Sequence, residues 1–120
     1  MDNYLYREEI LDHYKDPHNF GKPHTFDISS MQYNPFCGDE IELFVSTEDD
    51  TVRDIHFKGK GCAISLAAAS MLTDFAKGKK KTALTKFSQH DMLDLLEIEL
   101  SETRKKCALL GWAVLQDCLK

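Results

Sequence analysis

The sequence predicts an α+β fold: a small three-stranded antiparallel sheet with helices packed on it. Strand-like segments are grouped in the first half of the chain and helix-like segments in the second half, which is the α+β pattern. Short turns separate the strand-like segments, and such turns join antiparallel strands. The chain has 120 residues, of which 42% are hydrophobic and 29% charged. We therefore expect one globular domain, residues 1–120, with a core of its own.

The first half begins with a predicted helix over residues 3–15, followed by breaks at Pro17 and Gly21. Its apolar side is expected to comprise Leu5, Ile10, Leu11 and Tyr14. A first strand is expected over residues 26–33, with weak alternation and a slip at Ser29–Ser30. The second strand is clearer, and the third covers about residues 52–58. Side chains expected to share one face are Ile41, Leu43 and Val45 in the second strand, and Ile55 and Phe57 in the third.

Three helices are predicted in the second half. The first spans residues 62–77, where apolar residues recur at helical spacing and Gly78 is a suitable stop. The second follows Ser88 and runs to about Ile98, and the third follows Ser101; both serines are favourable N-caps. In the last helix we expect close packing at Gly111. The side chains expected to face inward there are Ala108, Trp112, Leu115 and Leu119.

Charge and composition limit the classes of function. Lys and Arg number 15 and Asp and Glu 20, a formal charge of −5, which argues against nucleic acid as the main partner. The basic run at residues 79–81 is interpreted as a solvated helix end. There is no basic region followed by an apolar stretch at the N-terminus, and no apolar run approaches the ~20 residues of a membrane span. We expect a cytoplasmic protein without a membrane span, whose four cysteines stay reduced.

Cys37 and Asp39 form the first candidate site. They lie two residues apart in a turn bracketed by Pro35 and Gly38, so both side chains can reach one ion. A buried cysteine beside an aspartate that stabilises the turn explains this segment equally well.

Cys62 forms the second candidate site. It follows a glycine-rich turn, residues 59–61, and starts a helix, where the positive end of the helix dipole stabilises a thiolate. A phosphate-binding loop is disfavoured because the Gly-Lys-Ser/Thr ending is missing.

Cys107 is the third candidate, early in the last helix and directly after Arg104, Lys105 and Lys106, whose charges favour a thiolate. A basic surface turn with a partly buried cysteine is the alternative. Cys118 lies 11 residues further on, ~16 Å along a continuous helix, too far to share an ion with Cys107. We assign Cys118 to packing or to the surface.

Cys37, Asp39, Cys62 and Cys107 together make a four-ligand set that suits tetrahedral zinc, while its cysteine content also suits an iron–sulfur cluster. The spacing is not that of a zinc finger, so the prediction rests on each cysteine lying near the boundary of an element. Because a carboxylate is a harder ligand than a thiolate, a labile site is expected. The five histidines are scattered, and His18 and His24 are interpreted as solvated loop residues.

These segments resemble the U-type iron–sulfur scaffold family, which comprises IscU, SufU and the N-terminal domain of NifU. The resemblance covers nearly the whole chain. It rests on the Tyr-x6-His-Tyr-x2-Pro-x-Asn pattern of residues 6–19, on Asn-Pro-x-Cys-Gly-Asp at 34–39, on Gly-x-Gly-Cys-Ala-Ile-Ser at 59–65 with Ala-Ser-Met at 69–71, and on Arg-x-x-Cys-Ala-x-Leu-x-Trp at 104–112.

The resemblance implies an α+β fold and a site built from Cys37, Asp39, Cys62 and Cys107. It implies a cysteine desulfurase as partner, which hands over sulfur as a persulfide, and recipient iron–sulfur apoproteins or carriers. Cys37 and Cys107 are the candidate sulfur acceptors, and Arg104 is expected to support them by pairing with Asp39 or with incoming anionic sulfur.

Two roles occur in this family, and the chain has features of both. IscU-like members have His before the third cysteine, whereas Lys106 stands here and gives a SufU-like motif. SufU members carry an insertion between the second and third cysteines, for which the 44 residues after Cys62 are too few. The Leu-Pro-Pro-Val-Lys segment that a chaperone reads in IscU is absent before Cys107.

The leading hypothesis is an iron–sulfur cluster assembly protein that accepts persulfide sulfur and assembles or relays a [2Fe–2S] cluster. The first alternative is a zinc-dependent sulfurtransferase without a cluster of its own. The second is a structural zinc domain that binds proteins. Because sulfur transfer and assembly differ from turnover of a small substrate, we leave open whether the protein counts as an enzyme.

Overall fold

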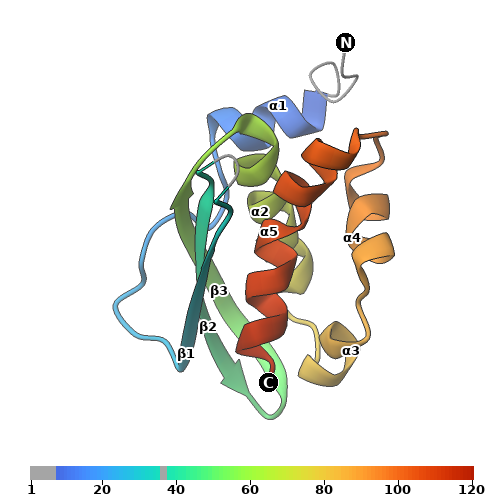
Figure 1. Cartoon of the computed structure of the whole chain (residues 1–120). Helices are drawn as coiled ribbons and strands as arrows, with labels where there is room; N and C mark the ends of the chain where they lie inside the picture. Colours follow the sequence, from blue (N-terminus) through green and yellow to red (C-terminus); the bar gives the residue numbers. More distant parts are fainter. Residues whose placement is uncertain (1–7, 36–37) are drawn as a thin grey trace.

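The described part of the chain folds into a three-stranded antiparallel sheet and five helices (Figure 1), as expected for the α+β class. The computed structural model describes residues 8–35 and 38–120. The elements, in chain order, are α1 (Glu8–Lys15), β1 (Ile28–Tyr33), β2 (Glu40–Glu48), β3 (Thr51–Lys60), α2 (Ala63–Ala76), α3 (Lys81–Thr85), α4 (Gln89–Leu96) and α5 (Glu102–Cys118).

The sheet has the order β1-β2-β3, with β2 in the centre. Register places Leu43 opposite Phe57 and Val45 opposite Ile55, which puts the apolar residues of β2 and β3 on one face. Asp49 and Asp50, both with positive φ, form the two-residue turn between these strands. The slip expected in the first strand is wrong, because exposure alternates without interruption along β1.

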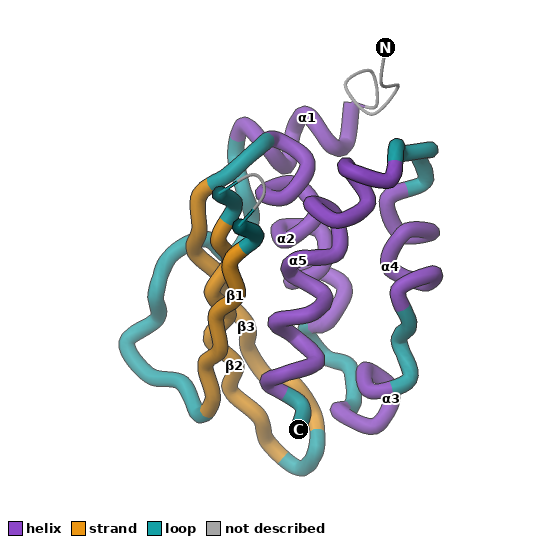
Figure 2. The backbone as a smooth tube through the Cα atoms, in the orientation of Figure 1, coloured by secondary structure: helices purple, strands orange, loops and turns teal. Residues whose placement is uncertain are grey.

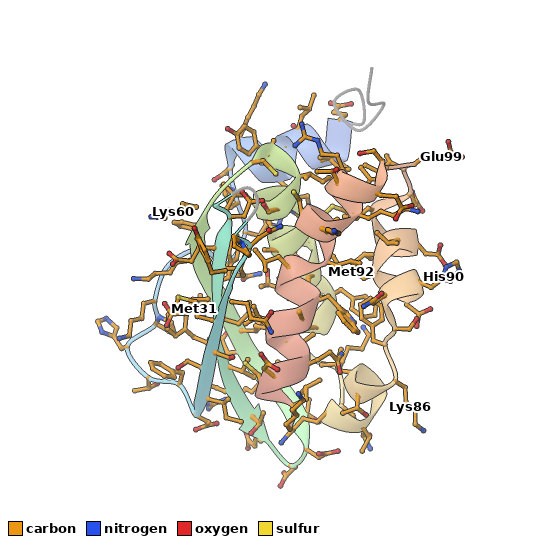
Figure 3. All side chains as sticks on the ribbon, in the orientation of Figure 1. Met31, Lys60, Lys86, His90, Met92 and Glu99 are labelled. Carbon is orange, nitrogen blue, oxygen red and sulfur yellow. The ribbon has the colours of Figure 1, made fainter. Side chains whose placement is uncertain are left out.

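The helices cover the apolar face of the sheet (Figures 1 and 2). α5 lies against β1 and β2, α2 packs on β3 and on α5, α1 packs on α2, and α4 packs on α5 and α2. The core residues between these layers include Leu43, Ile55, Leu72 and Leu115, all fully buried. On the opposite face, Met31 of β1 points away from the helices (Figure 3).

The helix boundaries follow local signals. Ser88 accepts a hydrogen bond from the Asp91 N–H and Ser101 one from the Arg104 N–H, so both predicted N-caps are confirmed. Gly78, with φ of +87°, follows the end of α2 as predicted. In α5, a Cβ built on Gly111 would lie 3.5 Å from the Ala69 Cβ, so the expected close packing against α2 is confirmed.

Some expectations need correction. Residues 3–7 of the first predicted helix lie outside the described residues. Tyr14 does not belong to the buried side of α1, which instead buries Ile10 and His13. The short helix α3 was not predicted, and the basic run enters it at Lys81. Among the described residues, no helix combines the length and apolar character needed to cross a membrane.

Candidate metal centre

The turn between β1 and β2 brings Asp39 to one end of the sheet. The Gly38 N–H donates to the Asn34 carbonyl at 2.8 Å, and the Asn34 N–H donates to the Asp39 carbonyl at 2.8 Å, so the turn closes on itself. Gly38 has φ of +76°, a conformation that favours glycine. Cys37, predicted to lie in this turn, is outside the described residues.

Cys62 lies at the same end of the sheet, between the end of β3 and the start of α2. It is the N-cap of α2, directly after β3 and Gly61, as the sequence predicted. Gly61 has φ of +153°, and a Cβ at this position would lie only 2.3 Å from Asp39 Oδ1. The glycine therefore provides the close approach that lets the Asp39 carboxylate lie against the start of α2.

The Asp39 carboxylate is held by three donors from the first turn of α2. Oδ1 accepts from the Cys62 N–H at 2.9 Å, and Oδ2 accepts from Ser65 Oγ at 2.7 Å and from Cys62 Sγ at 3.4 Å. Ser65 Oγ is also 3.4 Å from Cys62 Sγ. The carboxylate is 1% exposed, and such burial requires hydrogen bonds or a cation as compensation.

Cys107, which belongs to α5, forms a group with Asp39 and Cys62. One donor atom from each of Asp39, Cys62 and Cys107 lies within 4.8 Å of the other two. Cys107 is buried and Cys62 is partly exposed, so the group is open to solvent on the Cys62 side. Three of the four residues predicted from the sequence are thus brought together by β2, the N-terminus of α2 and the second turn of α5.

The donor set of this group fits a thiophilic ion. Two thiols and a carboxylate converge there, the ligand types of zinc sites, and cysteine ligation also suits an iron–sulfur cluster. The predicted fourth ligand, Cys37, is two residues before Asp39 in the sequence and lies outside the described residues. We conclude that the residues present fit either group.

Arg104 lies three residues before Cys107 in α5, a spacing that puts both on one side of the helix. It is half-buried, whereas Lys106 is exposed. Pairing of Arg104 with Asp39 stays a prediction.

Cys118 is separate from this group, as predicted. It lies at the end of α5 and is 1% exposed. Burial, with a smaller contribution from Asp117, raises the pKa of its thiol to about 11. A thiol with this pKa is protonated at neutral pH and is neither a nucleophile nor a ready ligand. Cys118 is therefore a packing residue.

Ser65 is the functional residue that the sequence reasoning missed. It is 1% exposed and its hydroxyl contacts both Asp39 and Cys62. The available signal was its spacing, because a residue three positions after an N-cap cysteine points to the same side of the helix start. The hydroxyl orients the carboxylate by donating to it.

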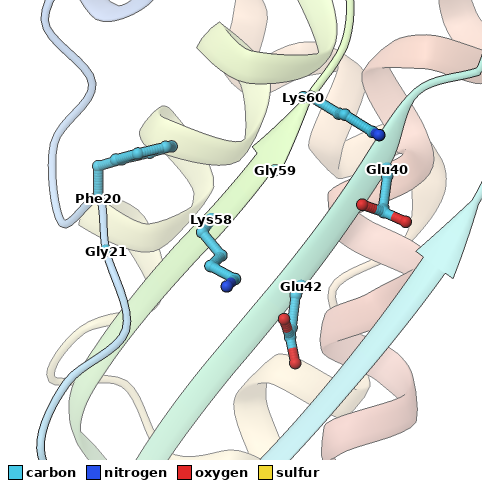
Figure 4. Close-up of a pocket in the computed structure, with 7 residues that line it drawn as sticks. All are labelled: Phe20, Gly21, Glu40, Glu42, Lys58, Gly59 and Lys60. Atoms are coloured by element: carbon cyan, nitrogen blue, oxygen red, sulfur yellow. The ribbon is translucent and has the colours of Figure 1, made fainter.

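A hollow of about 310 Å³ lies beside the candidate centre, on the sheet face away from the helices (Figure 4). It is lined by Phe20, Gly21, Glu40, Glu42, Lys58, Gly59 and Lys60. The strand register sets Glu40 opposite Lys60 and Glu42 opposite Lys58. Of the candidate ligands that the structure describes, Asp39, Cys62 and Cys107, none lines it, so the hollow is a feature distinct from these three residues.

Comparisons with known proteins agree with this fold. Residues 5–120 match the model of the NifU-like N terminal domain. The zinc-dependent sulfurtransferase SufU of Bacillus subtilis is 41% identical, over 93% of this chain and 87% of that protein. The iron–sulfur cluster assembly scaffold protein IscU of Streptococcus pyogenes is 34% identical, over 98% of this chain and 84% of that protein.

A solved structure supports the same assignment. A crystallised protein from Fervidobacterium islandicum, described as an iron–sulfur cluster assembly scaffold for the SUF system, superposes with a TM-score of 0.85 and 27% identity, over 98% of both chains. The expected resemblance is therefore confirmed. From the match over residues 5–120 and from these relatives, the chain belongs to the NifU-like N-terminal domain family.

Proposed function

We propose that this protein takes part in iron–sulfur cluster assembly in the cytoplasm by accepting persulfide sulfur from a cysteine desulfurase and assembling or relaying a cluster. The observation that carries the proposal is the convergence of Asp39, Cys62 and Cys107, with donor atoms within 4.8 Å of one another. The similarity of the chain to the SufU of B. subtilis and to the IscU of S. pyogenes also supports the proposal. Recipient iron–sulfur apoproteins or carriers would be the next partners.

Sulfur transfer would be a thiol–disulfide type of exchange. An acceptor thiolate, Cys37 or Cys107, attacks the outer sulfur of the desulfurase persulfide, and the desulfurase cysteine leaves as a thiolate. One S–S bond breaks and one forms, so the step needs no external oxidant or reductant. Arg104, close in sequence to Cys107, would stabilise the anionic persulfide once it forms.

Cys37, Asp39, Cys62 and Cys107 would hold the zinc ion or the cluster. A bound zinc ion would keep the ligating thiols in their thiolate form. Asp39 is the weakest ligand of the four, and the Cys62 N–H is already in place as an alternative partner. If the carboxylate left the metal, this N–H would accommodate its charge, while the Ser65 hydroxyl would keep it oriented for rebinding. This would make the site labile.

Zinc-dependent sulfur relay without a cluster is the second candidate function. Lys106 favours it, because the His that precedes the third cysteine in cluster scaffolds is missing. The 41% sequence identity to the zinc-dependent sulfurtransferase SufU of B. subtilis also favours this second function. Both candidates use the same four ligands.

Anaerobic reconstitution with iron, cysteine and a desulfurase distinguishes the two. Cluster assembly predicts stoichiometric [2Fe–2S] absorption that moves to an added apoprotein. Retained zinc with a persulfide on one cysteine, seen by mass spectrometry, would establish the relay instead.

Single serine variants test the site itself. Cys37→Ser, Cys62→Ser and Cys107→Ser should each weaken zinc binding, with Cys118→Ser as the matched control that leaves it unchanged. Zinc binding by all three variants as tight as that of the parent would remove both candidate functions.

A further inference from the structure

A second group of metal-ligating side chains lies on the outer side of α2. It comprises His13 of α1, His18 of the following loop and Asp74 near the end of α2, here called the histidine cluster. One donor atom from each of the three lies within 4.8 Å of the other two. The imidazole centroids of His13 and His18 are 4.3 Å apart. The sequence reasoning treated these histidines as scattered.

His13 is fixed within this cluster. Its side chain is buried, and its Nδ1 lies 2.7 Å from Ser70 Oγ. The same hydroxyl oxygen accepts from the His18 N–H at 2.7 Å, so one serine sets the positions of both histidines. A histidine ring held through one nitrogen can offer the other to a metal, which is the usual arrangement of histidine ligands.

Asp74 and His18 supply the adjustable part of the cluster. Asp74 Oδ2 contacts His18 Nδ1 at 2.5 Å, and Oδ1 accepts from Asn19 Nδ2 at 2.9 Å. The side chains of His18 and Asp74 are 52% and 45% exposed. Ligands of one ion at ~2.0–2.2 Å lie roughly 3.3 Å apart, so a small rotation of these two exposed side chains brings them into range.

A metal ion can reach the histidine cluster from solvent, and nearby carboxylates attract it. A hollow of about 260 Å³, lined by Glu9, His13, Met71, Asp74, Phe75 and Leu95, opens beside the cluster. The carboxylates of Asp74, Glu9 and Asp12 all act electrostatically on His13. Acidic groups around a hollow raise the local concentration of cations.

We propose that His13, His18 and Asp74 form a second metal site, which takes a divalent first-row transition ion such as zinc or ferrous iron. Two imidazoles and one carboxylate suit such ions and leave coordination positions for water. Asp74 is 12 residues after Cys62, ~18 Å along α2, so this ion is separate from the cysteine centre. With two ligands half-exposed, the ion exchanges with solvent. The site does not depend on the function proposed above.

Titration of the zinc-loaded protein tests this site. The full chain, holding one equivalent of Zn²⁺, is titrated with Co²⁺, which binds less tightly than Zn²⁺ and leaves it in place. We expect a second equivalent to bind with a Kd below about 100 μM. It should have no thiolate-to-cobalt absorption and should broaden the ring NMR signals of His13 and His18.

Substitutions assign the ligands. His18→Gln and Asp74→Asn should each weaken binding of the second equivalent by about tenfold or more, while the first Zn²⁺ stays bound. These two residues are chosen because they are half-exposed, whereas a change at buried His13 could unfold the protein. The matched control is His90→Gln. His90 forms a similar His–Asp pair with Asp94 at 3.3 Å on the exposed side of α4 (Figure 3), and the described part of the chain offers this pair no third ligand.

The proposal is overturned if no second equivalent binds below about 1 mM. It is also overturned if His18→Gln and Asp74→Asn bind Co²⁺ as tightly as the parent, or if His90→Gln alone weakens binding. Retention of the first Zn²⁺ by all three cysteine variants, with the second ion also bound, would count against the cysteine centre and would leave this site standing.

Discussion

Ser65 donates a hydrogen bond of 2.7 Å to the Asp39 carboxylate, joining the first turn of α2 to the turn before β2. Both side chains are about 1% exposed, and 26 residues separate them in the chain. The serine therefore fixes the orientation of the one candidate ligand that is not a cysteine. We expect this contact to control the affinity of the centre.

Ser65→Ala should weaken zinc binding by about 10- to 100-fold, because loss of an orienting partner of a ligand has effects of this size. The metal-free protein should lose about 1–3 kcal/mol of unfolding free energy, since a buried carboxylate loses a hydrogen bond. Competition with a chromophoric chelator measures the affinity, and urea unfolding measures the stability. Ser70→Ala, equally buried in α2, is the control and should leave the first zinc unaffected. Equal affinity of Ser65→Ala and the parent would contradict the role.

Gly61→Ala should displace the Asp39 carboxylate. The new Cβ would lie 2.3 Å from Asp39 Oδ1 and 3.0 Å from its Cβ, and the backbone φ is unfavourable for alanine. We expect lower zinc affinity together with a loss of stability of about 1–3 kcal/mol. Gly78→Ala is the matched control, because it also has positive φ but nothing within 4 Å. It should cost about 1 kcal/mol and leave zinc affinity unchanged. The interpretation fails if both variants bind zinc like the parent.

Cys118 should resist alkylation at pH 8. With a pKa of about 11, only about one thiol in a thousand is ionised at that pH, and burial restricts access further. The reaction rate in the folded protein should rise with pH towards 11, because the thiolate is the reactive form. Mass spectrometry after iodoacetamide treatment should find Cys62 of the metal-free protein, which is partly exposed, modified before buried Cys118. Rapid modification of Cys118 in the native state would show that its end of α5 opens readily.

Removal of metal should leave the protein folded. The core between the sheet and the helices includes Ile55, Phe57, Leu72 and Leu115, all fully buried and contributed by β3, α2 and α5. Bound zinc then adds only its binding free energy to the stability. After chelation, far-UV circular dichroism should keep its shape and thermal unfolding should stay cooperative at a lower Tm. Unfolding on chelation would favour the structural zinc domain instead.

Much of the fold could be predicted because its signals are local. The N-caps Ser88 and Ser101, the stop at Gly78 and the alternation of Ile41, Leu43 and Val45 each act within a few residues. The helix α3 could not be predicted in this way, since it has five residues and only Leu84 is buried. The burial of His13 was missed because its partner Ser70 is 57 residues away.

The sequence by itself determined the fold class, the family and a short set of candidate ligands, because glycines, caps and cysteines act through local backbone geometry and intrinsic chemistry. Only the tertiary structure decided which side chains meet. It brought Cys107 to Asp39 and Cys62, left Cys118 in the core, and placed Ser65 against Asp39 and His18 against Asp74. The physical reason is that these contacts join elements far apart in the chain, and packing of α1, α2 and α5 sets their distances.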